Sequence, residues 1–429
     1  MLHNLFTRFL QSVDSIARNR AYMLLGGVFV LLVTSSIFYT KANRFADVES
    51  HIPATILALQ YGYDLEGYGL SFVGAKGVED TYGNGTLRIL NEGIVPDSFG
   101  HYRSTIGVQG FFYAWLYQTF NLTSFKVLYW LNALFGAMAL LICAILLGKI
   151  FGRAFGVIFF LSLFTSSWVA NFSGSLYFSL AFWILPAIIA FSLYIYLINS
   201  LRGGGGKSIV IALCLCFTLA IALRASMSYE FITSIILFSL SPFIVSFIYG
   251  VLTSYQSPFL SLSVKKAFKY GLGLFILACV GFGLTFMIHT YIRGGGDLWA
   301  GFADIYHNDF LRRMTGGNPK DFHPVYADSL NASVLEVIKV YLKMDIKLFA
   351  ILCVSIFACF IESSKEYRAF YIALLVCFAL PALSWFVLGK SHSYIHRHFC
   401  FMLWYLGFWA SIIYVPICCL YRRLYHPTC

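Results

Sequence analysis

The sequence predicts an all-α membrane protein with about ten transmembrane helices and two large loops on the outer side of the membrane. Three observations support this fold class: the composition, the apolar runs and the distribution of charge. Hydrophobic residues make up 59% of the 429 residues and charged residues only 11%, whereas about a quarter of a typical soluble domain is charged. We therefore treat residues 1–429 as a single integral membrane domain.

Apolar runs of membrane-spanning length recur along the chain. The first, residues 21–40, has no A-x-A-like cleavage site close behind it, so we expect a retained helix rather than a signal peptide. The others lie near residues 127–148, 154–171, 174–198, 208–223, 230–250, 269–291, 346–361, 369–389 and 399–420. An even number of spans predicts that both chain ends lie on the same side of the membrane.

Basic residues occupy alternate connections between these runs. One set of connections holds fourteen of them: Arg8, Arg18, Arg20, Lys149, Arg153, Arg202, Lys207, Lys265, Lys266, Lys269, Lys365, Arg368, Arg422 and Arg423. The short connections on the other side hold only Arg224, Lys390 and Arg397. By the positive-inside rule, both termini are cytoplasmic, and the net charge of +11 reflects this topology rather than a nucleic-acid partner.

Acidic residues show the opposite distribution. Of the 19, eight lie in residues 41–126 and seven in residues 292–345, the two long connections on the outer side. Two acid-rich outer loops predict a site that faces away from the cytoplasm, which in a bacterial inner membrane means the periplasm. All eleven cysteines lie outside these loops, so the sequence supports neither a disulfide framework nor a zinc site with cysteine ligands.

The main candidate for catalysis follows the first span. Pro53 suits the first turn of a helix, so residues 53–62 are predicted to be helical and residues 47–51 extended. Period-two alternation then puts Asp47, Glu49 and His51 on one side. A carboxylate beside an imidazole at the membrane surface can serve as a general base or bind a cation. The alternative is a solvated edge of a membrane helix.

Two further segments of the outer side are predicted to lie at the membrane surface. Residues 105–121 are aromatic and too short to span, which favours an interfacial helix. Residues 390–398 combine Lys390, His392, His396, Arg397 and His398 at the mouth of the last span. Such a cluster suits a phosphate carried on a lipid, and its alternative is contact with lipid headgroups.

Arg224 is a second cation at an outer helix end, close to Glu230 in sequence. Charges at membrane depth are rare and usually paired or functional.

The segment Gly203-Gly-Gly-Gly-Lys207-Ser208 resembles the end of a phosphate-binding loop. That motif requires a glycine at the position of Leu201 and a strand before it, and here a membrane helix precedes the segment. A cytoplasmic turn with positive charges is the preferred interpretation. No Asp-x-Asp pair occurs in the sequence, so a metal-bound nucleotide-sugar site of the usual kind has no support.

The order of these features resembles the glycosyltransferase C superfamily. After the acidic segment, the resemblance rests on residues 54–62, 109–121, 128–136 and 146–152, and on two shorter matches. Those are Ala220-Ile-Ala-Leu-Arg224, at a basic helix end, and His396-Arg397-His398, before a late helix. Protein O-mannosyltransferases and lipid A aminoarabinose transferases belong to this superfamily. The size and loop layout are also similar to phage-borne glucosyltransferases that modify the O-antigen of bacterial lipopolysaccharide.

The resemblance implies an inverting enzyme that takes a sugar from a polyprenyl-phosphate donor and adds it to a glycan, lipid or protein acceptor on the outer face. Asp47 would deprotonate the acceptor hydroxyl, and Glu49 and His51 would orient the base or the acceptor. The family pattern has two adjacent acids, whereas Val48 separates them here, so the two roles could be exchanged. Candidates for binding the lipid phosphate are Arg224, Arg293, His392, His396, Arg397 and His398. Some members of the superfamily use a divalent metal ion and others do not, so the resemblance does not decide whether this chain needs one.

Two other classes of membrane protein remain as alternatives. A transporter or flippase for lipid-linked saccharides would use the same charges without making bonds, and should have helices broken by Gly or Pro in paired halves. An O-antigen polymerase or ligase would also face outward, without requiring an acid after the first helix.

The charge distribution gives a topological prediction. Reporter fusions at Arg202, Lys265 and Glu366 should report the cytoplasm, and fusions at Gly83 and Asn318 the exterior, because basic residues are retained inside. If fusions at Gly83 and Lys265 report the same side, the acid-rich loops do not face outward and the predicted location of the site is wrong.

Overall fold

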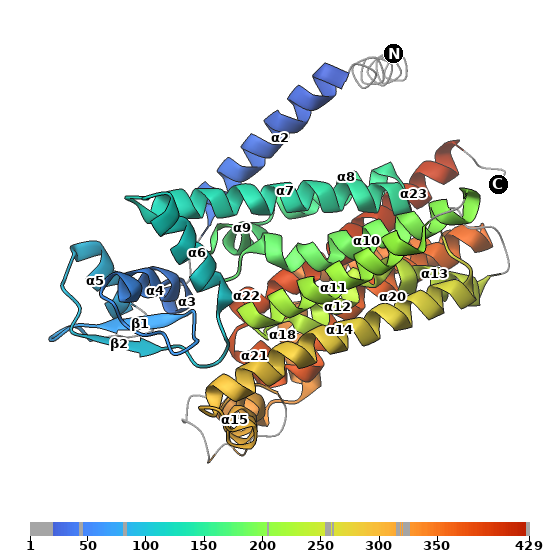
Figure 1. Ribbon diagram of the computed structural model, residues 1–429. Coiled ribbons are helices and arrows are strands. Elements are labelled where there is room, and N and C mark those ends of the chain that lie inside the picture. Colours follow the sequence, from blue (N-terminus) through green and yellow to red (C-terminus); the bar gives the residue numbers. More distant parts are fainter. Residues whose placement is uncertain are drawn as a thin grey trace.

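The computed structural model is a bundle of long helices with two smaller groups of elements at one end (Figure 1). It describes residues 20–42, 46–79, 84–203, 206–253, 259, 261–314, 318, 320 and 327–425. Within these residues, six helices are long and apolar enough to cross a membrane, and up to nine spans result if each of three bent helix pairs counts as one. The chain is therefore a helical membrane protein, and the predicted number of ten spans is not confirmed.

The helices of the bundle coincide with the apolar runs of the sequence. They are α2 (Arg20–Lys41), α7 (Phe125–Phe151), α8 (Arg153–Phe164), α9 (Ser167–Gly174), α10 (Leu180–Gly203), α11 (Lys207–Met227), α12 (Ile232–Ser239), α13 (Ser241–Leu252), α14 (Val264–Arg293), α19 (Ile346–Ile361), α20 (Lys365–Leu388), the 3₁₀ helix η4 (Phe401–Tyr405) and α23 (Phe408–Tyr425). The α2 helix has 22 residues, and its segment Leu25–Lys41 is an apolar helix in addition to the six spans.

Two of the runs, residues 154–171 and 230–250, are broken helices rather than straight spans, and a third bent pair joins the helix of residues 346–361 to one before it. The axes turn by 74° between α8 and α9 and by 59° between α12 and α13. They turn by 95° between the α19 helix and α18 (Val334–Met344) before it. New helices start at local signals within the runs: Ser166 accepts a hydrogen bond from the Val169 amide, and Pro242 occupies the first turn of α13. Hydropathy alone does not detect such breaks.

The described part of the first long connection, which the sequence predicts to be an outer loop and which keeps that name below, forms a small α/β layer. Its helices are α3 (Ala46–Glu49), α4 (His51–Gln60), α5 (Asn84–Glu92) and α6 (Val108–Thr119). Strands β1 (Ser71–Gly74) and β2 (Ser98–His101) pair antiparallel, with Phe72 opposite Gly100. A small core of Ala54, Val73, Ala75 and Ile89 joins α4 to this sheet. The sheet is an addition to the all-α prediction.

Two local predictions in this loop change. The prediction that residues 47–51 are extended is wrong, because α3 is helical and Ser50 (φ −67°, ψ −26°) continues that path directly into α4. Pro53 does lie in the first turn of α4, as expected, but the helix starts two residues earlier. The predicted helix in residues 105–121 is confirmed as α6, which buries Gln109 and Tyr113 and exposes Trp115. Its position at the membrane surface stays a prediction.

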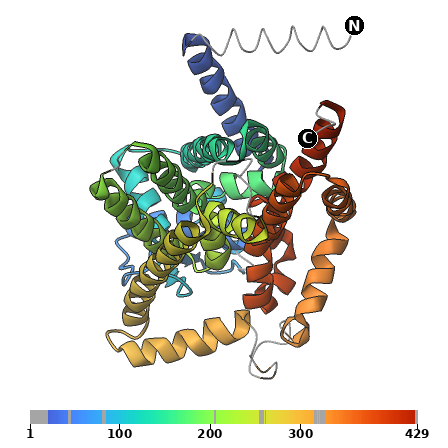
Figure 2. The same cartoon turned by 90° about the vertical axis from the view of Figure 1, so that its right-hand side faces the viewer.

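The second outer loop continues from α14 through α15 (Leu298–Ile305), the π-helix η1 (Tyr306–Phe310) and α16 (Leu311–Arg313). After α17 (Ala327–Asn331) and α18 it returns to the bundle, and α21 (Lys390–Ile395) and α22 (Arg397–Cys400) follow the α20 helix. The α15 helix lies across the end of α14, seen nearly end-on in Figure 1 and lengthwise in Figure 2. Figure 1 shows the first outer loop at the same end of the bundle as α15, and Ser104 of the first loop contacts Asp309 of the second.

Candidate functional site

The acidic segment after the first span is anchored to the bundle by Glu49. This side chain is only 2% exposed, and its Oε1 accepts a hydrogen bond from the Leu176 amide at 2.9 Å. Leu176 lies in the connection between α9 and α10, which a buried asparagine holds in place. Glu49 thus ties α3 to that connection. Asp47 lies in α3, and its side chain falls outside the described part of the structure.

That asparagine is Asn132 on α7, which is fully buried. Its Nδ2 donates to the carbonyl oxygens of Ser173 and Ser175, both at 2.7 Å. Its Oδ1 accepts from the hydroxyls of Tyr113 (2.7 Å) and Ser179 (2.6 Å). All polar groups of the amide that face the connection are paired, as a buried amide requires. Side chains of three helices therefore hold the connection in place: Glu49 of α3, Tyr113 of α6 and Asn132 of α7.

His51 lies in an aromatic pocket next to this segment. Its ring is buried, and its centroid lies 4.6 Å from that of Tyr102, 5.1 Å from Phe72 and 6.2 Å from Tyr177. The rings of Tyr102 and Tyr177 in turn lie 6.3 Å apart, edge to face. Tyr177 belongs to the same connection as Leu176, so His51 and Glu49 contact neighbouring residues of it.

Arg224 stabilises the turn between α11 and α12. Its guanidinium group is buried over the ring of Trp183, 5.1 Å from the centroid, and donates to the carbonyl oxygens of Ser228 (2.8 Å) and Glu230 (3.0 Å). These bonds shape the turn that presents Glu230. The role of Arg224 as a phosphate ligand stays a prediction, and in this structure two of its nitrogens are directed at carbonyl groups.

Glu230 joins this turn to the histidine-rich segment. Its Oε1 lies 3.2 Å from Nε2 of His392 on α21, and the rings of His392 and His396 lie 4.6 Å apart. Burial raises the pKa of Glu230, but the hydrogen bond from His392 and the charges of Arg313 and His396 outweigh burial and leave this pKa below its ordinary value. The carboxylate is therefore ionised at neutral pH.

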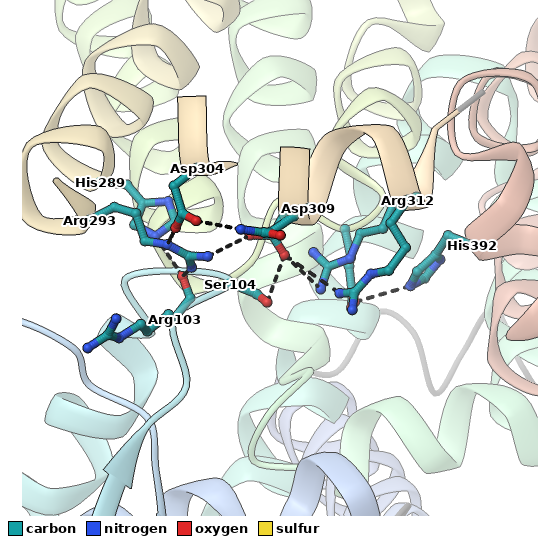
Figure 3. A network of polar contacts seen from close by, with 11 residues as sticks. Arg103, Ser104, His289, Arg293, Asp304, Asp309, Arg312 and His392 are labelled. Carbon is teal, nitrogen blue, oxygen red and sulfur yellow. Dashed lines mark hydrogen bonds and ion pairs between the residues drawn. The ribbon is translucent and has the colours of Figure 1, made fainter. Parts of the chain in front are cut away.

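Asp309 connects the two outer loops (Figure 3). Its carboxylate is 7% exposed and accepts a hydrogen bond from Ser104 Oγ at 2.9 Å. Guanidinium nitrogens of Arg293, Arg312 and Arg313 lie 3.5, 3.7 and 3.6 Å from its oxygens. Residues of the first loop, of α14 and of the second loop thus meet at one buried acid.

Arg293 and His289, one turn apart at the end of α14, make the remaining links to the first loop. Arg293 forms an ion pair with Asp304 and donates to the carbonyl oxygen of Arg103. His289 is buried, with Nε2 3.0 Å from that same carbonyl oxygen and Nδ1 2.9 Å from the Tyr229 hydroxyl. The segment before Ser104 is therefore held by two side chains of one helix face.

An open apolar pocket of about 410 Å³ leads to these charges. Apolar side chains of α12, α14 and α20 form most of it, including Ile232, Ile236, Phe275, Phe282, Phe286 and Leu388. Glu230, Asp309 and Arg313 also line it. Burial opposes the charge of Arg313, yet its neighbours Tyr102, Asp309 and Glu230 raise its pKa above the ordinary value. The pocket thus combines a long apolar wall with a cationic group that stays charged.

The structure brings part of the predicted site together. His392 pairs with Glu230 and its ring lies against that of His396, and Arg293 pairs with Asp309. Arg397 is exposed on α22, and the side chain of His398 lies outside the described part. Arg313 lines the apolar pocket together with Glu230, the partner of His392.

Four important residues of this cluster were not predicted as site residues: His289, Asp309, Arg312 and Arg313. An Arg-Arg pair in an otherwise acidic outer loop departs from the positive-inside pattern, and this departure was the available signal. His289 gives no such signal, because it lies within an apolar run.

Comparison of the chain with protein-family models, with curated proteins and with solved structures found no match. Among the residues that the structure describes, no group of three or more His, Cys, Asp or Glu side chains is arranged to hold a metal ion.

The burial of Asp309 predicts an unequal effect of two similar substitutions. Asp309→Asn leaves three arginines without their shared carboxylate and should reduce the free energy of unfolding by about 3–5 kcal/mol, the usual cost of breaking a buried ion pair. Asp304→Asn is the matched control, because the Asp304 side chain is 39% exposed, and exposed pairs contribute only about 0–1 kcal/mol. Chemical denaturation in detergent measures both, and equal losses would contradict the assigned role of Asp309.

Proposed function

We propose that this protein is a membrane glycosyltransferase that transfers a sugar from a polyprenyl-phosphate donor to an acceptor hydroxyl on the outer face of the membrane. The observation that supports this most directly is the apolar pocket that ends at Arg313, Asp309 and Glu230. A prenyl chain fits the apolar wall, and its phosphate fits a charged arginine at the end. The acceptor in this proposal is a cell-surface glycan such as the O-antigen.

The charge balance of the cluster supports an anionic ligand. Among the described residues, the charged side chains that pair with or adjoin Asp309 and Glu230 include four arginines, Arg224, Arg293, Arg312 and Arg313, against three carboxylates, Asp304, Asp309 and Glu230. The cluster is thus positive before any histidine is protonated. A phosphate at its edge would offset this excess, and the low dielectric of the pocket strengthens the attraction.

The proposed reaction is a single displacement with inversion at the anomeric carbon. Asp47 takes the proton of the acceptor hydroxyl, whose oxygen forms a bond to that carbon while the bond to the lipid phosphate oxygen breaks. Arg313, with His392 and His396 behind Glu230, stabilises the charge that develops on the departing phosphate. Glu49 positions α3 through Leu176, and His51 orients the acceptor from its aromatic pocket.

A transporter for lipid-linked saccharides is the second candidate, and one observation favours it. The bends between α8 and α9 and between α12 and α13 interrupt apolar helices, as occurs in many transporters around a binding site. The same pocket would then hold the lipid without a chemical step. The two candidates differ in their dependence on a general base.

The general base gives the first test of the proposal. Asp47→Asn should lower product formation by about 10²–10⁴, the usual contribution of general acid–base catalysis. Glu49→Gln should lower it less, through a displaced α3. Product is measured by mass spectrometry with purified protein in vesicles that contain a polyprenyl-phosphate sugar and an acceptor glycan.

The Asp47→Asn, Glu49→Gln double variant distinguishes the candidates. Full activity in this variant at normal membrane levels would falsify the catalytic proposal. A transporter forms no product in this assay, so movement of lipid-linked sugar across the vesicle without product formation by the wild type would favour the transporter. A larger effect of Glu49→Gln than of Asp47→Asn would exchange the two roles without changing the class.

The phosphate ligand gives the second test. A charge-assisted hydrogen bond contributes about 1.5–3 kcal/mol, so Arg313→Ala should weaken use of the donor by about ten- to a hundredfold. Arg313→Lys should recover part of this, because it keeps the charge and loses the planar fork. The apparent donor affinity is measured in the same vesicle assay.

The Arg397→Ala variant is the comparison, since Arg397 is exposed at the end of the histidine cluster. A similar loss there would support the sequence-based prediction that Arg397 also binds the phosphate. If Arg313→Ala leaves donor use unchanged, the pocket does not hold the lipid phosphate in the proposed way.

A further inference from the structure

The α15 helix and the η1 turn after it have an inverted distribution of polarity. Their acidic side chains, Asp304 and Asp309, point into the protein and pair with arginines (Figure 3). Their aromatic side chains are on the outside: the exposed fractions are 76% for Trp299, 39% for Phe302, 40% for Tyr306 and 47% for Phe310. A helix on a water-facing surface shows the opposite arrangement.

The four aromatic residues, which we call the aromatic row, form one continuous stack. Centroid distances between successive rings are 5.8, 6.2 and 5.6 Å, and the planes of each pair lie within 25° of parallel. Their spacing of three, four and four residues follows one face of a helix. The row is therefore one narrow apolar strip rather than a set of scattered exposed side chains.

The π-helical turn separates the row from the acid. Residues seven apart share a face of a regular α-helix, so an uninterrupted helix would place Asp309 beneath Phe302, within the aromatic row. The wider turn of η1, residues Tyr306–Phe310, adds one residue and rotates Asp309 toward the protein interior. Tyr306 and Phe310 stay on the outside.

The aromatic row continues an exposed apolar surface of the α14 helix, which is long and apolar enough to cross a membrane. The preceding helix α14 exposes Met287, Ile288 and Tyr291, each at 57%, in its last turns. The α15 helix then lies across the end of α14 (Figures 1 and 2). A helix that lies across the end of a membrane span is at the height of the lipid headgroups, where Trp and Tyr are enriched.

We propose that the aromatic row docks into the headgroup region of the outer leaflet and that its occupant is the lipid bilayer itself. The rings of Trp299 and Tyr306 suit this layer because each has an apolar body and one polar atom. A second copy of the chain fits less well: the row is about 16 Å long and one ring wide, whereas a stable protein interface buries about 1,600 Å² in total. This inference is independent of the proposed reaction.

Docking of the aromatic row would also determine the depth of the apolar pocket relative to the membrane. Ile305 and Phe310 of this segment line the pocket, together with Met314 directly after it. With the aromatic row in the headgroup layer, the pocket opens at the level where the polar end of a lipid lies. The Asp309 carboxylate stays buried, and the Asp304 carboxylate faces Arg293, so arginines neutralise both charges.

Fluorescence quenching by brominated lipids tests this inference. The full chain is reconstituted in phosphatidylcholine–phosphatidylglycerol vesicles whose acyl chains carry bromine either near the ester or near the methyl end. The difference in emission between the wild type and Trp299→Phe isolates the signal of Trp299. An interfacial helix lies about 5–10 Å into the headgroup and acyl boundary, so we expect strong quenching by bromine near the ester and weak quenching by bromine near the methyl end.

Trp183→Phe is the matched control, because Trp183 is 1% exposed and its signal should be unaffected by either lipid. Thermal unfolding of Trp299→Phe checks that the variant is folded. Absence of lipid quenching of Trp299, or stronger quenching by the deep bromine, would overturn the proposal. So would a dimer in detergent, detected by light scattering, that Trp299→Ala converts to a monomer, since a second copy would then cover the row.

Discussion

Asp309 is buried among three arginines at the point where both outer loops and the end of α14 meet. A buried carboxylate is tolerated only when it is paired and hydrogen-bonded, and here Ser104 supplies the hydrogen bond from the first loop. Ser104 lies 205 residues from Asp309 in the sequence. The requirement to pair this one acid therefore holds two distant segments of the chain against each other.

The same requirement explains the orientation of the second loop. Because Asp304 and Asp309 must reach Arg293, the polar face of α15 and η1 turns inward and the aromatic face has to turn outward. The π-helical turn allows the Asp309 side chain and the aromatic row to point in different directions. Phe310, next to Asp309, then lines the apolar pocket, so one local distortion contributes to the charge cluster, the exposed aromatic row and the pocket.

Much of the helical architecture is predictable from the sequence because membrane helices are marked by length and apolarity alone. The breaks within them are not, since they depend on single residues such as Ser166 and Pro242. The period-two argument for residues 47–51 failed because it assumed a strand where a helical turn brings Glu49 to the Leu176 amide. The Glu230–His392 pair spans 162 residues, and only tertiary packing brings these two predicted neighbourhoods together.

The candidate site has two halves, and the charge cluster at Asp309 also determines the distance between them. The half with α3 and His51 belongs to the first loop and ends at Tyr102, whose ring lies 4.6 Å from that of His51. The other half has Arg313, which belongs to the second loop and lines the apolar pocket formed mostly by α12, α14 and α20. Tyr102 is near enough to Arg313 to help raise the pKa of this arginine. Ser104, which binds Asp309, is only two residues beyond Tyr102. In the proposed reaction, an acid from one half must act on a sugar whose phosphate is bound by the other. A displacement of the charge cluster would change the distance between the acid and the bound phosphate. In the proposed reaction, the cluster therefore has a positioning role in addition to any contact with the lipid phosphate.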